Sequence, residues 1–263
     1  LVYELMQLEK AENLSISVRT ALTDTYRTQV IRRDDAWLDA IILRMLSGSY
    51  EEAAKMLQEK SFHIYEGGEG KLTKYHRWLH ILMAAEKIAQ KDYTAAGELF
   101  DQALIYPSNY GEGKGFLEQD ANVYYFAGLL REKTGKEEEA KRFYEKAEEE
   151  PELVNEILFF TGLCEEKLGH RERAEHHFHL LLEEGEKYAA HPHRYGYFGV
   201  GMESPLPFES DIQRNNLTKA YLLRMLAYKG LKKEAAFEGE KRKLAELDPG
   251  NSLLIFLEKL EII

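Results

Sequence analysis

The chain has 263 residues, of which 44% are apolar and 31% are charged, a composition that predicts a soluble, charge-rich helical protein with a sizeable core. Its net charge of −11 argues against a protein that binds nucleic acid through the phosphate backbone. Cys164 is the only cysteine, so an intramolecular disulfide and a zinc site built from cysteines are both excluded.

The sequence contains no signal for a membrane or for export. No apolar run approaches the roughly 18 residues of a membrane-spanning helix. The chain begins with Leu1-Val2-Tyr3 and has neither an initiator methionine nor a signal segment. We therefore expect a piece of a longer protein, whose signal sequence, if it has one, would lie outside these residues, and no contact with a membrane. The single cysteine fits a reducing compartment, so we expect a cytoplasmic location.

A pattern of small and aromatic residues recurs along the chain and predicts pairs of helices. Residues 78–106 carry it most clearly, with Pro107 as the stop, and the same frame fits 124–151 and 158–185. An earlier unit starts at Trp37 and a last one at about Leu217. This is the spacing of the tetratricopeptide unit, in which small residues let two helices approach closely and an aromatic ring fills the space beside them.

The repeat pattern predicts an all-α, right-handed α-solenoid of tetratricopeptide-type helix pairs. One equivalent alanine marks each of five units, at steps of 43, 44, 34 and 61 residues: Ala53, Ala96, Ala140, Ala174 and Ala235. Residues 1–36 are interpreted as the helical remnant of a preceding repeat. Residues 37–250 would form the five pairs, with inserts at 61–76, 106–120 and 186–215. Residues 251–263 are expected to form a C-terminal capping helix.

The inserts give the chain a specific resemblance. The segments 62–71 and 106–114, Arg32-Arg33-Asp34-Asp35, and 195–208 with its final Leu206-Pro207-Phe208 resemble the tail of large bacterial proteins. These proteins carry an uncharacterised amino-terminal domain (domain of unknown function, number 5107) followed by tetratricopeptide units. The resemblance covers nearly the whole chain and implies a helical-repeat fold within a larger parent protein. That family's amino-terminal region is similar to sugar-binding β-sandwich domains of the mutarotase type, and the resemblance implies no catalytic residue.

A short motif, Gly-Glu-Gly-Lys, occurs twice in these inserts, 43 residues apart. The copies are Gly68-Glu69-Gly70-Lys71 and Gly111-Glu112-Gly113-Lys114. Neither is a nucleotide P-loop, because Leu72 and Gly115 stand where serine or threonine is required. In one interpretation, the glycines curl backbone N–H groups into an anion-binding nest at a helix start, with lysine adding charge. In the other, the glycines supply positive φ while Glu and Lys pair or cap helices. The spacing predicts both loops at one edge of the array, where they would share a ligand or a docking surface.

The first helix of each pair is expected to line a concave groove. The groove positions are Leu38, Ile42, Trp78, Ile81, Asn122, Tyr125, Glu156 and Phe159. Trp78, Tyr125 and Phe159 would form an aromatic stripe suited to an extended peptide or a sugar ring. The alternative is that these rings pack against neighbouring repeats or the long insert.

The histidines do not predict a metal site. His176, His177 and His179 share one expected helix, and His191 and His193 lie in the following insert, with no spacing that brings the two groups together. Cys164 falls inside a helix, where a small thiol packs. No catalytic residue, metal or cofactor is therefore predicted.

Together these features predict a non-catalytic scaffold that mediates protein–protein or interdomain binding. Its partner would be another protein or peptide, or the amino-terminal domain of its own parent. The alternative is an accessory domain of a carbohydrate-binding or carbohydrate-processing enzyme that contributes loops to a sugar site.

Overall fold

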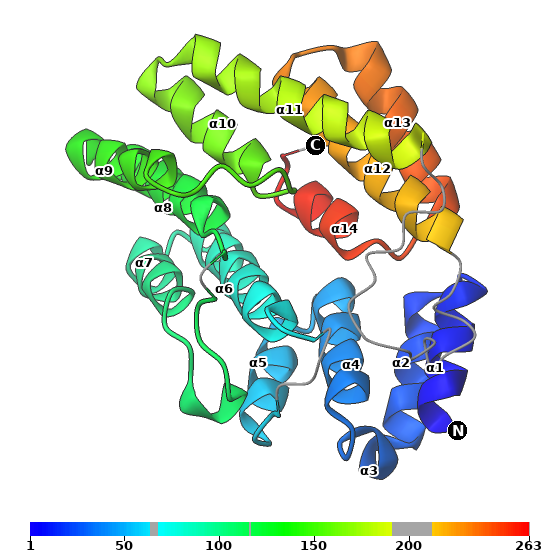
Figure 1. Ribbon diagram of the computed structural model, residues 1–263. Helices are drawn as coiled ribbons and strands as arrows, with labels where there is room; N and C mark the ends of the chain where they lie inside the picture. The colour runs from blue at the N-terminus through cyan, green and yellow to red at the C-terminus, as the bar shows by residue number, and fades with distance from the viewer. Residues whose placement is uncertain (64–67, 116, 191–211, 263) are drawn as a thin grey trace.

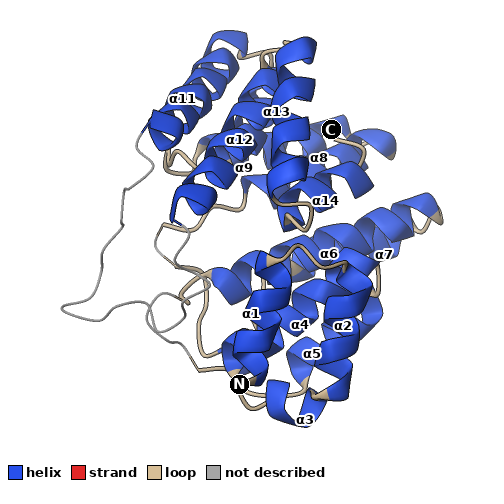
Figure 2. Cartoon of the chain, turned by 90° about the vertical axis from the view of Figure 1, so that its right-hand side faces the viewer, coloured by secondary structure: helices blue, strands red, loops and turns tan. Residues whose placement is uncertain are grey.

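The computed structural model describes residues 1–63, 68–115, 117–190 and 212–262, and within these ranges every regular element is a helix (Figures 1 and 2). The predicted all-α class is thus confirmed. None of the described helices combines the length and the apolar character needed to cross a bilayer. The predicted insert 186–215 is described only at its ends. Its aromatic segment 195–208, with His191 and His193, lies outside the described residues.

Helices that follow one another in sequence pack as pairs across 34–247, which gives the chain a repeat-like architecture. Three shorter helices precede the pairs: α1 (Val2–Ala11), α2 (Ile16–Thr25) and α3 (Arg27–Val30). The five pairs are α4 (Asp34–Ser47) with α5 (Tyr50–Gln58), α6 (Lys71–Ala89) with α7 (Tyr93–Gln102), α8 (Ala121–Lys133) with α9 (Glu137–Glu148), α10 (Leu158–Leu168) with α11 (Arg171–Ala190), and α12 (Ile212–Gly230) with α13 (Glu234–Leu247). A 3-10 turn, η1 (Ser108–Tyr110), lies in the second insert, and α14 (Ser252–Lys259) ends the array.

The pairs follow a curve, so that the end of the array returns to its start (Figure 1). The Arg214 guanidinium of α12 donates hydrogen bonds to the carbonyl oxygen of Ala11 at 2.8 Å and to Asn13 Oδ1 at 2.6 Å. A third bond, of 2.9 Å, reaches the carbonyl oxygen of Leu247. The Arg214 side chain of α12 thus connects the end of α1 to the end of α13.

Glycines face aromatic rings inside the pairs, as the repeat spacing predicts. A Cβ atom added to Gly128 in α8 would lie 2.2 Å from Cε1 of Tyr144 in α9. One added to Gly162 in α10 would lie 2.5 Å from Cε1 of Phe178 in α11. Both rings are buried, so glycine is what allows the helices to approach this closely.

We expect Gly162→Ala to destabilise the protein, although alanine is the better helix former. Overpacking a core costs about 1–3 kcal/mol, and replacing glycine in a helix recovers only about 0.5–1 kcal/mol. Gly239 in α13 is the matched control, because an added Cβ there meets nothing within 4 Å. Gly239→Ala should raise the urea midpoint and Gly162→Ala should lower it. Equal shifts of the same sign would contradict the packing account.

The last helix, α14, does not simply extend the end of the array. It packs on α4 and α6, and Figure 1 shows it in the centre of the curve. The ring of Phe256 lies 5.9 Å from that of Trp78, and the Lys259 ammonium lies 5.6 Å from the centre of the Tyr50 ring. An ion pair of 3.0 Å between Lys241 and Glu258 also links it to α13. The expected capping helix thus covers the inner side of the first two pairs.

Candidate functional site

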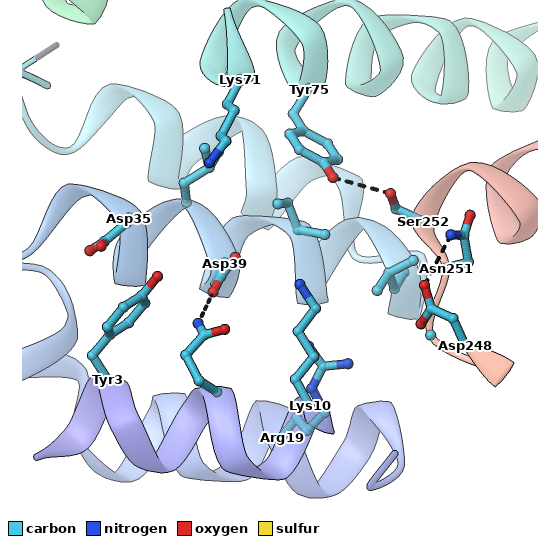
Figure 3. Close-up of a pocket in the computed structure, with 15 residues that line it drawn as sticks. Tyr3, Lys10, Arg19, Asp35, Asp39, Lys71, Tyr75, Asp248, Asn251 and Ser252 are labelled. Carbon is cyan, nitrogen blue, oxygen red and sulfur yellow. Dashed lines mark hydrogen bonds between the residues drawn. The ribbon is translucent and has the colours of Figure 1, made fainter. Parts of the chain in front are cut away.

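A pocket of about 300 Å³ opens where the start and the end of the chain meet (Figure 3). Its walls come from α1, α2, the first turn of α6 and the segment 248–252 that leads into α14. Its floor is Leu38, Ile42 and Leu46, which share one face of α4 because they are four residues apart. Leu38 and Ile42 are two of the predicted groove positions.

The acidic groups of this pocket already have hydrogen-bond donors. Asp35 accepts two bonds from the Arg33 guanidinium, at 2.6 and 2.8 Å, and a third from the backbone N–H of Ala36. Asp39 accepts from Gln7 Nε2 at 2.8 Å. Asp248 accepts from Asn251 Nδ2 at 3.0 Å. Each of these three carboxylates therefore already accepts a hydrogen bond from a neighbouring group of the protein.

The basic groups of the pocket are different. Within the described part of the chain, the side chains of Lys10, Arg19 and Lys71 take part in no ion pair and no hydrogen bond. Figure 3 shows Lys71 reaching down from α6, while Lys10 and Arg19 rise from the opposite wall. Burial lowers the pKa of the half-buried Arg19, and the charges of Asp39, Asp248 and Glu9 oppose that shift. Arginine stays charged at any physiological pH. The guanidinium N–H groups of Arg19 therefore face the pocket without a hydrogen-bond acceptor among the described residues.

One hydrogen bond connects the α6 side of the pocket to the α14 side. The hydroxyl groups of Tyr75 in α6 and Ser252 in α14 lie 3.1 Å apart, as the dashed line in Figure 3 shows. On the other side, a Cβ atom on Gly250 would lie 3.1 Å from Nη1 of Arg19. The pocket thus depends on α14 folding back between the first two pairs.

The two Gly-Glu-Gly-Lys loops lie in direct contact, but they do not have the same conformation. The backbone N–H of Gly70 donates to Glu112 Oε2 at 3.1 Å, which places the Glu112 carboxylate at the N-terminus of α6. Positive φ occurs at the third residue of the first copy, Gly70, and at the first residue of the second, Gly111. The anion at this helix start is therefore supplied by the protein itself, which fits the structural interpretation.

The two lysines of the motif have different surroundings. Lys114 Nζ lies 2.6 Å from Asp120 Oδ2 and 3.2 Å from Glu150 Oε1, which raises its pKa to about 12 against the opposing effect of burial. Lys71, the first residue of α6, points into the pocket instead. The second copy also does not lead directly into a helix, because α8 begins only at Ala121. Two glycines of the motif remain. Gly68 lines a small pocket together with Glu112. Gly113 faces open space, since an added Cβ atom there would meet nothing within 4 Å.

The second insert is anchored on α6 by a buried ionic network. Arg77 Nη1 donates to Tyr106 Oη and to Glu118 Oε2, both at 2.6 Å, and lies 3.4 Å from Asp120 Oδ1. Arg77 and Asp120 are both buried. Burial acts to lower the pKa of Arg77, but Tyr106, Glu118 and Asp120 outweigh it and raise that pKa. Sequence reasoning missed this arginine, which no motif marks.

The predicted groove residues are mostly inside the protein. Trp78, Ile81 and Phe159 are at most 1% exposed, so their side chains are packed rather than presented to a ligand. Asn122 is also buried, and neither atom of its amide group has a hydrogen-bond partner in the described structure. Tyr125 is partly exposed and lines a separate pocket of about 270 Å³ with Arg171 and Lys232.

Two described histidines of α11, His176 and His177, lie near carboxylates. His177 Nδ1 lies 2.8 Å from Glu165 Oε2, and its Nε2 lies 2.9 Å from Glu152 Oε2. Burial would lower the pKa of His177, but these two carboxylates raise it overall. Among the described side chains, no group of three or more histidine, cysteine or acidic residues is arranged to hold a metal ion.

The first turns of the array present an apolar surface. The described structure exposes seven large apolar side chains. Five of them lie in 1–26: Leu1, Leu5, Leu14, Val18 and Tyr26. At 100° per residue, Leu1, Leu5 and Leu8 fall on the face of α1 opposite Tyr3, Gln7 and Lys10, which line the pocket. Helix α1 therefore buries Tyr3, Met6 and Gln7 on its inner face and leaves Leu1 and Leu5 exposed on its outer face.

No protein-family model matches this chain. The sites are thus defined by their own geometry.

Proposed function

We propose that this chain is a non-catalytic helical-repeat scaffold of the tetratricopeptide type, which docks a helical protein surface against its α1–α2 end. The observation that carries this proposal is the exposure of large apolar side chains on both α1 and α2, where Leu5 is 40% and Val18 is 47% exposed. Stacked helix pairs bury their apolar faces only against a neighbour, so an open face of this kind suits one more helical layer. By the resemblance described above, that layer would be a further helical-repeat unit of the parent protein.

A site-specific photo-crosslinker tests this assignment in cells that make the natural protein. p-Benzoylphenylalanine at Leu5 or Val18 should give discrete crosslinked peptides from one docked helical segment. The same probe at Ile105, which is 66% exposed but lies far along the chain, should not. With the probe placed at Leu14 instead, the substitutions Leu5→Glu and Val18→Glu together should abolish its crosslink. Identical, diffuse crosslinks from all positions would refute docking at this end.

The peptides recovered also distinguish the kinds of partner. Peptides from the same open reading frame identify interdomain docking, and peptides from a second protein identify a separate partner. Crosslinks only between copies of 1–263 would instead assign the face to self-association and overturn the proposed scaffold role.

A further inference from the structure

The pocket of Figure 3 has an imbalance between donors and acceptors that points to a ligand. Its three carboxylates each accept hydrogen bonds from the protein, whereas Lys10, Arg19 and Lys71 donate none from their side chains within the described residues. Charged donors that face a concave space without an acceptor are satisfied by water or by an anion. The arrangement therefore favours an anionic group.

The neighbouring acids narrow the kind of anion. Asp35, Asp39 and Asp248 all line the same space, and they would repel a phosphate group, which carries a charge of about −1.5 to −2, more strongly than a single negative charge. A planar carboxylate also matches the two-pronged donor geometry of Arg19. A monovalent carboxylate is thus the better fit on both counts.

The floor and the size of the pocket describe the rest of the ligand. Leu38, Ile42 and Leu46 offer an aliphatic strip beneath the charged groups. A volume of about 300 Å³ is at the lower end of the range for small-molecule sites. This leaves room for a carboxylate on a short aliphatic chain.

We infer that this pocket binds a carboxylate on a short aliphatic chain, with the carboxylate held by Lys10, Arg19 and Lys71 above the strip formed by Leu38, Ile42 and Leu46. The ligand is either a free organic acid or the side chain of a glutamate in a protein segment. This inference does not depend on docking at the outer face of α1, because the pocket uses the inner face of that helix. It does extend the interpretation of the first Gly-Glu-Gly-Lys copy, whose lysine becomes a ligand-binding residue.

Calorimetric titration of the whole chain tests the inference with matched probes. Glutarate represents the free acid, and a short peptide with blocked ends and one central glutamate represents the side chain. Glutaramide has the same shape without charge, inorganic phosphate tests the anion type, and glucose tests a neutral sugar. We expect saturable binding of glutarate or of the peptide, with glutaramide, phosphate and glucose at least about tenfold weaker.

Variants assign the binding to the named residues. Arg19→Gln and Lys71→Met should each weaken the binding of the better carboxylate probe by about tenfold or more. Lys133→Met is the control, since Lys133 is an exposed lysine at the end of α8 that does not line the pocket. Thermal midpoints should stay close to that of the parent chain, because within the described residues the Arg19 and Lys71 side chains take part in no hydrogen bond or ion pair.

Three outcomes would overturn the inference. These are no binding of either carboxylate probe at millimolar concentration, equal binding of glutarate and glutaramide, and unchanged binding in both Arg19→Gln and Lys71→Met. None of them bears on the crosslinking test of the α1–α2 face, so the two proposals can fail separately.

Discussion

Replacing Arg77 by methionine is expected to lower the free energy of unfolding by about 3–5 kcal/mol, the usual cost of removing one partner from a buried ionic network. Methionine keeps most of the aliphatic volume, so the loss comes from the charge and its hydrogen bonds rather than from a cavity. Arg77 is 5% exposed, and its guanidinium joins Tyr106, Glu118 and Asp120 within the second insert. Without it, Asp120 stays buried and, among the described residues, keeps Lys114 as its one cationic partner.

Urea denaturation gives the free energy, and Arg142→Met is the control. Arg142 is exposed on α9 and should change stability by less than about 0.5 kcal/mol. Hydrogen exchange adds a local test, since the segment 106–120 should lose protection first if Arg77 anchors it to α6. A loss no larger than that of the control, with unchanged exchange in the insert, would contradict the assigned role.

The helix pairs are largely predictable from sequence because they depend on contacts between neighbouring segments. Gly128 meets Tyr144 and Gly162 meets Phe178 within single pairs, at separations of 16 residues. A recurring spacing of small and aromatic residues is enough to reveal such contacts. The proximity of the two Gly-Glu-Gly-Lys loops could also be inferred, since equivalent positions in consecutive repeats lie close together.

The pocket could not be predicted in the same way. Its residues come from both ends of the chain, and they meet only because the array curves and α14 folds back onto α4 and α6. Curvature is the sum of small rotations at each interface, which residue spacing does not encode. The contact between the two Gly-Glu-Gly-Lys loops could be predicted only in part. The sequence does not reveal that the Glu112 carboxylate lies at the start of α6, where an anionic ligand is expected.

The position of Trp78 illustrates the same difficulty and leads to the second large effect. By its place in the predicted repeat, Trp78 is expected to line the concave surface, where it would either contact a ligand or pack against neighbouring repeats. In the structure its ring lies 5.7 Å from Phe160 of α10 and 5.9 Å from Phe256 of α14, and it is 1% exposed. Helix α14 thus fills the part of the groove that the repeat pattern predicts to be open.

We therefore expect Trp78→Ala to destabilise the protein by about 3–5 kcal/mol, the range for truncating a large aromatic residue in a core. A ligand-contacting tryptophan on an open groove would cost far less, so the urea midpoint distinguishes the two roles. Ile105→Ala is the control, because that side chain is 66% exposed and should change stability by less than about 0.5 kcal/mol.

A double-mutant cycle with Phe256→Ala identifies the contact that matters. If Trp78 holds α14 in place, the two substitutions should not be additive. The free energy of unfolding lost in the double variant should be smaller than the sum of the two single losses, by about 0.5–1.5 kcal/mol, the coupling typical of an aromatic pair. Both single variants should also weaken carboxylate binding, because Asn251 and Ser252 at the start of α14 form the far wall of the pocket. Strictly additive losses with intact binding would show that α14 is held by other contacts and that the pocket does not depend on this ring pair.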